Sequence, residues 1–504
     1  MTHDNDRGAG EPSAELEPPL VELDGEPAEE DAAWEPIPPE PEPTTYAAPV
    51  APAAETASVA PVAAEPVRAD ERFASVDLLR GVALCGILAM NIVDFAWPDA
   101  KYMNPYAGPD RPSVLDLSAW TFNHVVFDTK MMTLFSMLFG AGLVLMGDRA
   151  EARGASIRGV YYRRVLWLLA IGLCHAYLIW AGDILVMYAE CGLLLYLFRK
   201  KTPRTLLITG ALLVSIIVPL YFGLLAGVNF MKATTARVEA RRAAAETPAT
   251  WETRVANFWT ANLRDEMTPN AEKRAENYRK NMTTYRGGYL GIVKERAKEV
   301  WKGQVFGMLF FGWWYTGGRM LIGMGLMKLG VFSAERSRRF YLRMLAVGYG
   351  LGLPLLILSS ARSIWIEFDP KYALSPWGLT GFLGSLPMVF GHIGAVMLIY
   401  QSGVATRLTR RLSAVGRMAL SNYLTHSIVC TTLFYGYGFG LFGHVGRAAL
   451  VLVVIAIWSV QIWYSPLWLA RFRYGPAEWL WRSLTYGKPQ PMRIRPASAA
   501  PAAA

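Results

Sequence analysis

Apolar residues follow one another along this chain in ten long runs between residues 76 and 470. A helix needs roughly 20 apolar residues to cross a hydrocarbon core of about 30 Å, and runs of about that length recur here. The loops between them are polar and mostly short. The pattern predicts an all-α, polytopic integral membrane protein with about ten transmembrane helices. The runs cover residues 76–96, 128–147, 163–181, 183–199, 204–229, 303–328, 339–360, 376–401, 412–440 and 446–470.

Charge in the connecting loops predicts the orientation of these helices. The loops after the second, fourth, sixth and eighth runs are rich in arginine and lysine, and so is the segment after the tenth. The other loops are close to neutral, apart from one long polar stretch. Short loops rich in Lys and Arg stay in the cytoplasm, so we expect both termini there and the protein in a bacterial inner membrane. The basic segments are 148–164, 199–204, 328–339, 407–417 and 471–482.

Two long polar regions flank or interrupt the runs. Residues 1–70 are rich in Pro, Ala and Glu and contain 17 acidic residues against two arginines. Such a segment cannot bury enough apolar surface to offset the entropy of ordering, which predicts a disordered cytoplasmic tail. Residues 231–300 have mixed charges and are expected to form an extracytoplasmic helical loop. Transmembrane helices then occupy 71–230 and 301–490, and a second disordered tail occupies 491–504.

The net charge of +9 combines an acidic tail with a strongly basic body. Nucleic-acid binding would explain a basic body, but its positive residues lie in short loops between apolar runs, which membrane orientation explains. We therefore expect the lipid bilayer, and no nucleic acid, as a partner. The four cysteines lie within apolar runs and lack the paired spacing of a zinc site, so no bound metal is expected.

The first run contains the first group of candidate functional residues. Asp77 and Arg80 are three residues apart and can pair on one helix face. Asn91 follows eleven residues after Arg80, which is three turns, and lies on that same face. This polar stripe is a candidate substrate-binding surface directed toward the interior of the helix bundle. A structural ion pair at the cytoplasmic end is the alternative interpretation.

The hairpin between the third and fourth runs contains the candidate catalytic residues His175, Asp183 and Glu190. A histidine beside a carboxylate can act as a general base, because the carboxylate fixes the tautomer and stabilises the imidazolium. Either Asp183 or Glu190 can take that role. Two structural interpretations stay open: Asp183 caps the fourth helix, and His175 makes an interhelical hydrogen bond.

Other polar residues at membrane depth are weaker candidates. Arg319 lies too deep to reach the interface easily, which calls for an anionic partner or ligand and makes it a candidate for substrate binding. Asn422 and His426 lie one turn apart. Asn422 is a further candidate for substrate binding, although polar contact between helices explains the pair equally. Lys130 lies at an interface, where its side chain can extend toward water.

Four stretches of this chain resemble the YeiB-like family of bacterial membrane proteins, which contains domain of unknown function 418. The resemblance spans roughly residues 72–490, and its longest motif is the C-terminal FRYGPAEWLWRSLTYG. The four stretches are 77–88, 135–142, 175–185 and 472–487. The Asp-x-x-Arg-Gly beginning of the first helix also looks like that of the transmembrane acyltransferases, including heparan glucosaminide N-acetyltransferase.

This wider resemblance implies transfer of an acyl group from cytoplasmic acyl-CoA to an acceptor at the outer face, such as an envelope glycan or lipid. His175 is then the expected general base, and Arg80 with other basic residues holds the phosphates of the donor. Two other functions remain open. The intramembrane charges also suit a transporter or flippase of a small polar or amphipathic molecule, and the long polar segments suit a membrane scaffold.

Overall fold

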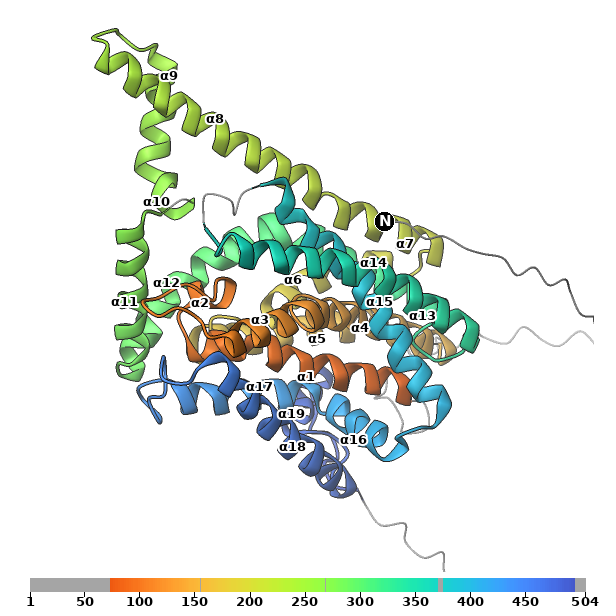
Figure 1. Ribbon diagram of the computed structural model, residues 1–504. Coiled ribbons are helices and arrows are strands. Elements are labelled where there is room, and N and C mark those ends of the chain that lie inside the picture. The colour runs from red at the N-terminus through yellow and green to blue at the C-terminus, as the bar shows by residue number, and fades with distance from the viewer. Residues whose placement is uncertain (1–72, 155, 268, 370–374, 495–504) are drawn as a thin grey trace, which may run out of the picture. The chain divides into compact units, whose positions relative to one another are not determined.

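The protein is helical, as a computed structural model shows (Figure 1). The structure describes residues 73–154, 156–267, 269–369 and 375–494. Within these ranges the backbone forms no strand and only one isolated bridge, between Phe472 and Arg493. The predicted all-α class is confirmed. The predicted tail over 1–70 lies outside the described residues, as does most of the predicted tail over 491–504.

Six helical segments of the described chain are long and apolar enough to cross a membrane, which supports a membrane protein. Helix α3 (Val114–Val126) runs into α4 (Lys130–Ala152), and α7 (Pro203–Ser215) runs into α8 (Ile217–Ala243), so each pair counts as one span. The other four are α1 (Ala74–Ala96), α14 (Arg338–Trp365), α15 (Leu379–Ser402) and α18 (Arg447–Arg471).

The structure does not confirm the expected count of ten spans. Helix α17 has only 16 residues and the apolar helix over residues 185–198 is also short. Helix α5 has 21 residues but includes several arginines and His175, which lower its hydropathy. The run expected at 303–328 is divided among the end of α12 (Tyr289–Gly307), π-helix η3 and α13. These shorter elements are α5 (Arg158–Leu178), α6 (Leu185–Leu195), η3 (Met308–Gly317), α13 (Gly318–Lys328) and α17 (Ala419–Phe434).

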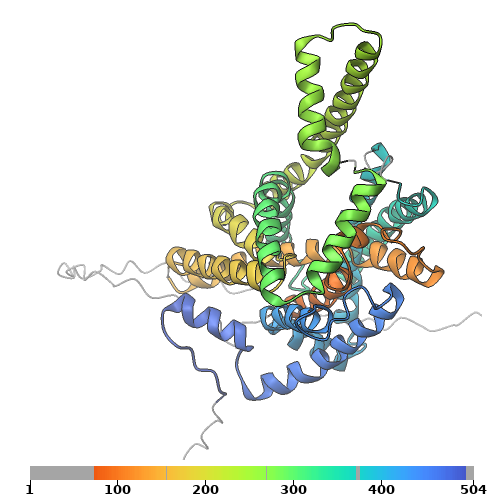
Figure 2. The ribbon, with the colours of Figure 1, turned by 90° about the vertical axis from the view of Figure 1, so that its left-hand side faces the viewer.

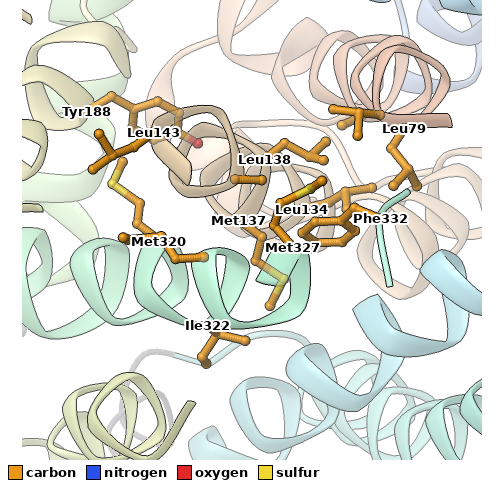
Figure 3. Close-up of a cluster of buried hydrophobic side chains, with 14 of the residues drawn as sticks. Leu79, Leu134, Met137, Leu138, Leu143, Tyr188, Met320, Ile322, Met327 and Phe332 are labelled. Atoms are coloured by element: carbon orange, nitrogen blue, oxygen red, sulfur yellow. The ribbon is translucent and has the colours of Figure 1, made fainter. Parts of the chain in front are cut away.

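Helix α1 lies at the centre of the helix bundle. Its most apolar window is 83% buried, whereas the corresponding window of Pro203–Ala243 is only 11% buried. Leu79 of α1 belongs to the main core, together with Leu134 and Met137 of α4 and Met320 of α13 (Figure 3). Large apolar side chains therefore surround α1 on most of its circumference, and α7–α8 presents its apolar face outward.

Two glycines bring α1 into direct backbone contact with α16 (Thr406–Arg417). A Cβ atom at Gly81 would lie 2.0 Å from the carbonyl oxygen of Leu412, and one at Gly416 would lie 1.9 Å from that of Asp77. No real side chain fits at those distances. The glycine of the Arg80-Gly81 pair therefore has a structural role. It lets α16 pack directly against α1, which leaves Arg80 beside the end of α16.

The polar region between the two halves is helical. It comprises the end of α8, α9 (Thr250–Phe258), η2 (Trp259–Leu263), α10 (Arg264–Met267), α11 (Ala271–Tyr285) and the start of α12 (Tyr289–Gly307). Figure 2 shows α8 and α9 side by side as a projecting hairpin. Glu252 closes it by pairing with Arg241 at 2.7 Å and with Arg237 at 3.5 Å. On which side of a membrane this region lies stays a prediction.

Candidate functional site

Three buried polar side chains form a hydrogen-bonded line between α5, the start of α6, and α17. His175 Nδ1 lies 2.7 Å from Asp183 Oδ1, and His175 Nε2 lies 2.8 Å from Ser427 Oγ. His175 and Ser427 are each 1% exposed, and the Asp183 side chain is 2% exposed. The line thus joins residues that are 252 positions apart in the sequence, His175 and Ser427.

Asp183 both orients His175 and caps a helix. Its Oδ1 atom faces His175, while its Oδ2 atom accepts a hydrogen bond from the backbone N–H of Val186 at 2.8 Å, in the first turn of α6. The contact with His175 and the capping contact are therefore both present, one at each carboxylate oxygen. The structure pairs His175 with Asp183, whereas half-buried Glu190 is not a hydrogen-bond partner of His175.

This arrangement has the chemistry of an acid–base–hydroxyl relay. An ionised Asp183 favours the tautomer that donates from Nδ1, which leaves Nε2 to accept the hydrogen bond of the Ser427 hydroxyl. In that tautomer His175 can take a proton from a hydroxyl group and Asp183 stabilises the resulting imidazolium. Ser427 is not predicted from the sequence, because no local pattern indicates that α17 packs against the hairpin at 175–183.

A cavity of about 280 Å³ lies close to this line of residues. Six arginines line it, against two acidic residues, Asp77 and Glu478. Asp77 is paired with Arg80 at 3.0 Å. The interior of the cavity is apolar and aromatic, and Leu138, Leu143 and Tyr188 belong both to it and to the main core. The arginines are Arg80, Arg149, Arg153, Arg164, Arg417 and Arg482.

One residue that lines the cavity, Tyr423, contacts His175. Tyr423, Ile184 and Leu185 line the cavity. The ring of Tyr423 lies 5.1 Å from that of His175, and its hydroxyl accepts a hydrogen bond from the backbone N–H of Ile184 at 3.4 Å. Tyr423 and Ser427 are four residues apart on α17 and share one face of that helix. The hydroxyl of Ser427 therefore lies one helical turn beyond the cavity.

The C-terminal motif forms one wall of the cavity through α19 (Pro476–Tyr486). Glu478 accepts hydrogen bonds from the backbone N–H groups of Leu420, at 2.6 Å, and Ser421, at 3.1 Å, and thereby caps α17. Burial raises the pKa of the Glu478 carboxyl, although these hydrogen bonds oppose the shift. Trp481 donates its indole N–H to the carbonyl oxygen of Arg164 at 2.8 Å. The guanidinium group of Arg164 stacks over the ring of Trp481.

The remaining candidates from the sequence lie elsewhere. Asn91 is half-buried and is not among the residues that line the cavity. Arg319 is 2% exposed and lies 3.1 Å from the centre of the Tyr315 ring. Its Nε and Nη1 atoms have no hydrogen-bond partner among the described residues. Arg80 thus lines the cavity, whereas Arg319 is not among its lining residues.

Asn422 belongs to a network between helices. It is fully buried and donates to the carbonyl oxygen of Val415 at 3.1 Å and to Ser465 Oγ at 3.3 Å, and Tyr464 donates to its side-chain oxygen. His426 Nε2 lies 2.8 Å from the amide oxygen of Gln461. These contacts join α16, α17 and α18 through every polar atom of the Asn422 side chain.

Comparison with known proteins decides the family. The family model "Protein of unknown function (DUF418)" matches residues 326–488. The uncharacterized protein YxaH of Bacillus subtilis (strain 168) is 33% identical over 434 residues, 85% of this chain and 98% of the relative. The uncharacterized protein YeiB of Escherichia coli (strain K12) is 33% identical over 429 residues, 82% of this chain and 96% of the relative. This chain belongs to the YeiB-like DUF418 family.

Similarity to other YeiB-like proteins extends well beyond the C-terminal motif. An alignment that covers 85% of the chain necessarily crosses the helices that contain His175, Asp183 and Ser427. A third relative, the uncharacterized 39.9 kDa protein in amylase 3′ region of Bacillus acidopullulyticus, is 24% identical over 86% of this chain and 99% of its own length. No solved structure matches this chain. The expected YeiB-like membership is thus confirmed, and the likeness to transmembrane acyltransferases stays a prediction.

Proposed function

We propose that this protein is a membrane-embedded acyltransferase that moves an acyl group from cytoplasmic acyl-CoA to a glycan or lipid of the cell envelope. One observation carries the proposal. A cavity lined by six arginines and many apolar side chains includes Tyr423, whose ring contacts a histidine held by a buried carboxylate. An acyl thioester of coenzyme A has the same sequence of parts: phosphates, then an uncharged arm, then a reactive carbonyl group.

The arginines suit the nucleotide end of the donor. Arginine binds phosphate through charge-assisted, often bidentate hydrogen bonds. A volume of about 280 Å³ is close to the lower limit of small-molecule sites, roughly 300 Å³. The cavity would therefore take the uncharged arm and acyl group, while the phosphates stay near the arginines.

The orientation predicted from the loops agrees with a cytoplasmic donor. Arg149, Arg153, Arg417 and Arg482 come from segments that the charge pattern assigns to the cytoplasm. Reporter fusions at residue 335 and at the C-terminus should therefore report the cytoplasm, and fusions near residues 105 and 265 the exterior. A C-terminus outside the cell would separate the arginines from acyl-CoA and contradict the proposal.

Transport of an anionic molecule is the second candidate function, and buried Arg319 favours it. A cation at membrane depth with two nitrogen atoms that have no hydrogen-bond partner among the described residues is typical of an ion or substrate path. The acyltransferase ranks first because Tyr423, which lines the described cavity, contacts His175, whereas Arg319 is not among the lining residues.

Direct binding tests the proposed function. The purified protein in lipid nanodiscs should bind acetyl-, octanoyl- or palmitoyl-CoA, and Arg482→Gln should weaken that binding about tenfold or more, because a charge-assisted hydrogen bond contributes roughly 1.5–3 kcal/mol. Arg407→Gln is the matched control, since Arg407 is exposed on α16 and does not line the cavity. Equal effects of the two substitutions, or no binding of any acyl-CoA, would contradict an acyl-CoA site here.

A further inference from the structure

We propose that Ser427 is the nucleophile of this enzyme and carries the acyl group as an ester between two half-reactions. The inference rests on the proposed acyltransferase function and makes it more specific. A histidine that only deprotonates the acceptor needs a carboxylate partner and an Nε2 atom that has no partner within the protein. Here Nε2 already faces a serine hydroxyl of the same chain at 2.8 Å.

Burial shields the hydrogen bonds between Asp183, His175 and Ser427 from water. The three side chains are between 1% and 2% exposed, so water does not compete for the hydrogen bonds of the line. Both ring nitrogens of His175 have partners, one carboxylate and one hydroxyl. The histidine is within hydrogen-bond reach of both the hydroxyl and the carboxylate. The same geometry activates serine as a nucleophile in unrelated folds.

In the first half-reaction, Ser427 Oγ attacks the thioester carbonyl carbon and its proton moves to His175 Nε2. The new carbon–oxygen bond forms as the carbon–sulfur bond breaks, and His175 returns the proton to the departing thiolate of coenzyme A. Asp183 stabilises the imidazolium that exists between these transfers. The products are an acyl ester on Ser427 and free coenzyme A.

In the second half-reaction, the acceptor hydroxyl or amine gives its proton to His175 Nε2 and attacks the ester carbonyl. The bond between the carbonyl carbon and Ser427 Oγ breaks, and His175 returns the proton to that oxygen. No oxidant, reductant or further reactant is needed. A covalent intermediate also lets the donor leave before the acceptor binds, so both substrates can use one histidine in turn.

Tyr423 controls access to Ser427. Its ring lines the cavity and contacts His175, one turn before Ser427 on the same helix. The thioester carbonyl reaches Ser427 only when this ring turns aside. Tyr423→Ala should therefore speed acylation of Ser427. A serine that only packs against His175 would take no label from acyl-CoA, with or without this substitution.

The test measures the first half-reaction without any acceptor. Full-length protein in nanodiscs is mixed with radiolabelled acetyl-, octanoyl- or palmitoyl-CoA, and the labelled peptide is located by mass spectrometry. We expect label on Ser427, and exchange of free labelled coenzyme A into the acyl-CoA pool. Ser427→Ala and His175→Gln should each lose both signals. Ser75→Ala is the matched control, because Ser75 is equally buried and donates to the carbonyl oxygen of Phe332 at 2.8 Å.

A cysteine variant keeps the test decisive. Ser427→Cys retains a nucleophile and should carry the label as a thioester, which hydroxylamine cleaves at neutral pH, whereas the ester on Ser427 resists it. Bound acyl-CoA without label on wild-type Ser427, or label on His175 instead, would overturn the inference and leave the proposed function standing. Failure of every acyl-CoA to bind would overturn both.

Discussion

Helix α17 takes part in two buried polar networks through neighbouring residues. Ser427 faces His175 and Asp183, whereas His426 faces Gln461 of α18. Both histidines are almost fully buried, at 1% for His175 and 2% for His426. Tyr423, which lines the arginine-lined cavity, contacts His175, whereas neither His426 nor Gln461 is among the lining residues. Burial and polarity therefore do not distinguish the two histidines, and it is the contact of His175 with a cavity-lining residue on which its proposed reactive role rests.

His175→Gln should have the largest effect. Glutamine keeps a hydrogen-bonding side chain but cannot accept a proton near neutral pH, so turnover should fall about 100- to 10,000-fold. The variant should insert and purify like the wild type. Acyl transfer with purified protein, or rescue of a deletion strain at native expression, measures the effect. Full rescue would show that His175 is only a packing contact.

Asp183→Asn should have a smaller effect, on the order of 100-fold in turnover. The asparagine oxygen can still accept from the N–H of Val186 and keep the cap of α6, but its amide donates to His175 Nδ1 and favours the wrong tautomer. Activity should fall while the melting temperature stays close to that of the wild type. A large loss of stability with unchanged turnover per folded molecule would assign Asp183 to capping alone.

His426→Gln should have the smallest effect and is the matched counterpart of His175→Gln. It removes or replaces one hydrogen bond between α17 and α18, which contributes only about 0.6 kcal/mol in membrane proteins. Thermal denaturation should show a small shift, and turnover should stay at the wild-type level. Equal loss of turnover in the two glutamine variants would remove the distinction between the networks.

Local patterns predicted the fold class and part of the site. Asp183 lies eight residues after His175 on one hairpin, so their contact follows from the chain itself. Ser427 comes from α17 and reaches His175 only through tertiary packing, which no local pattern encodes. Helical spacing predicts Glu190 on the same face as Asp183, but of these two carboxylates it is that of Asp183 that reaches the ring of His175. The expected ten spans exceed the six long apolar segments of the described chain for a similar reason, since short or charged helices can pack against longer ones.

The backbone contact at Gly81 and Gly416 has a consequence for ligand recognition. It fixes the register between α1 and α16, and hence the position of Arg80 relative to Arg417. The charge pattern beside the cavity is therefore preorganised, and a phosphate would meet it without first rearranging the helices. Electrostatic attraction to such a site raises the association rate, so binding of an anionic ligand should slow steeply as ionic strength rises.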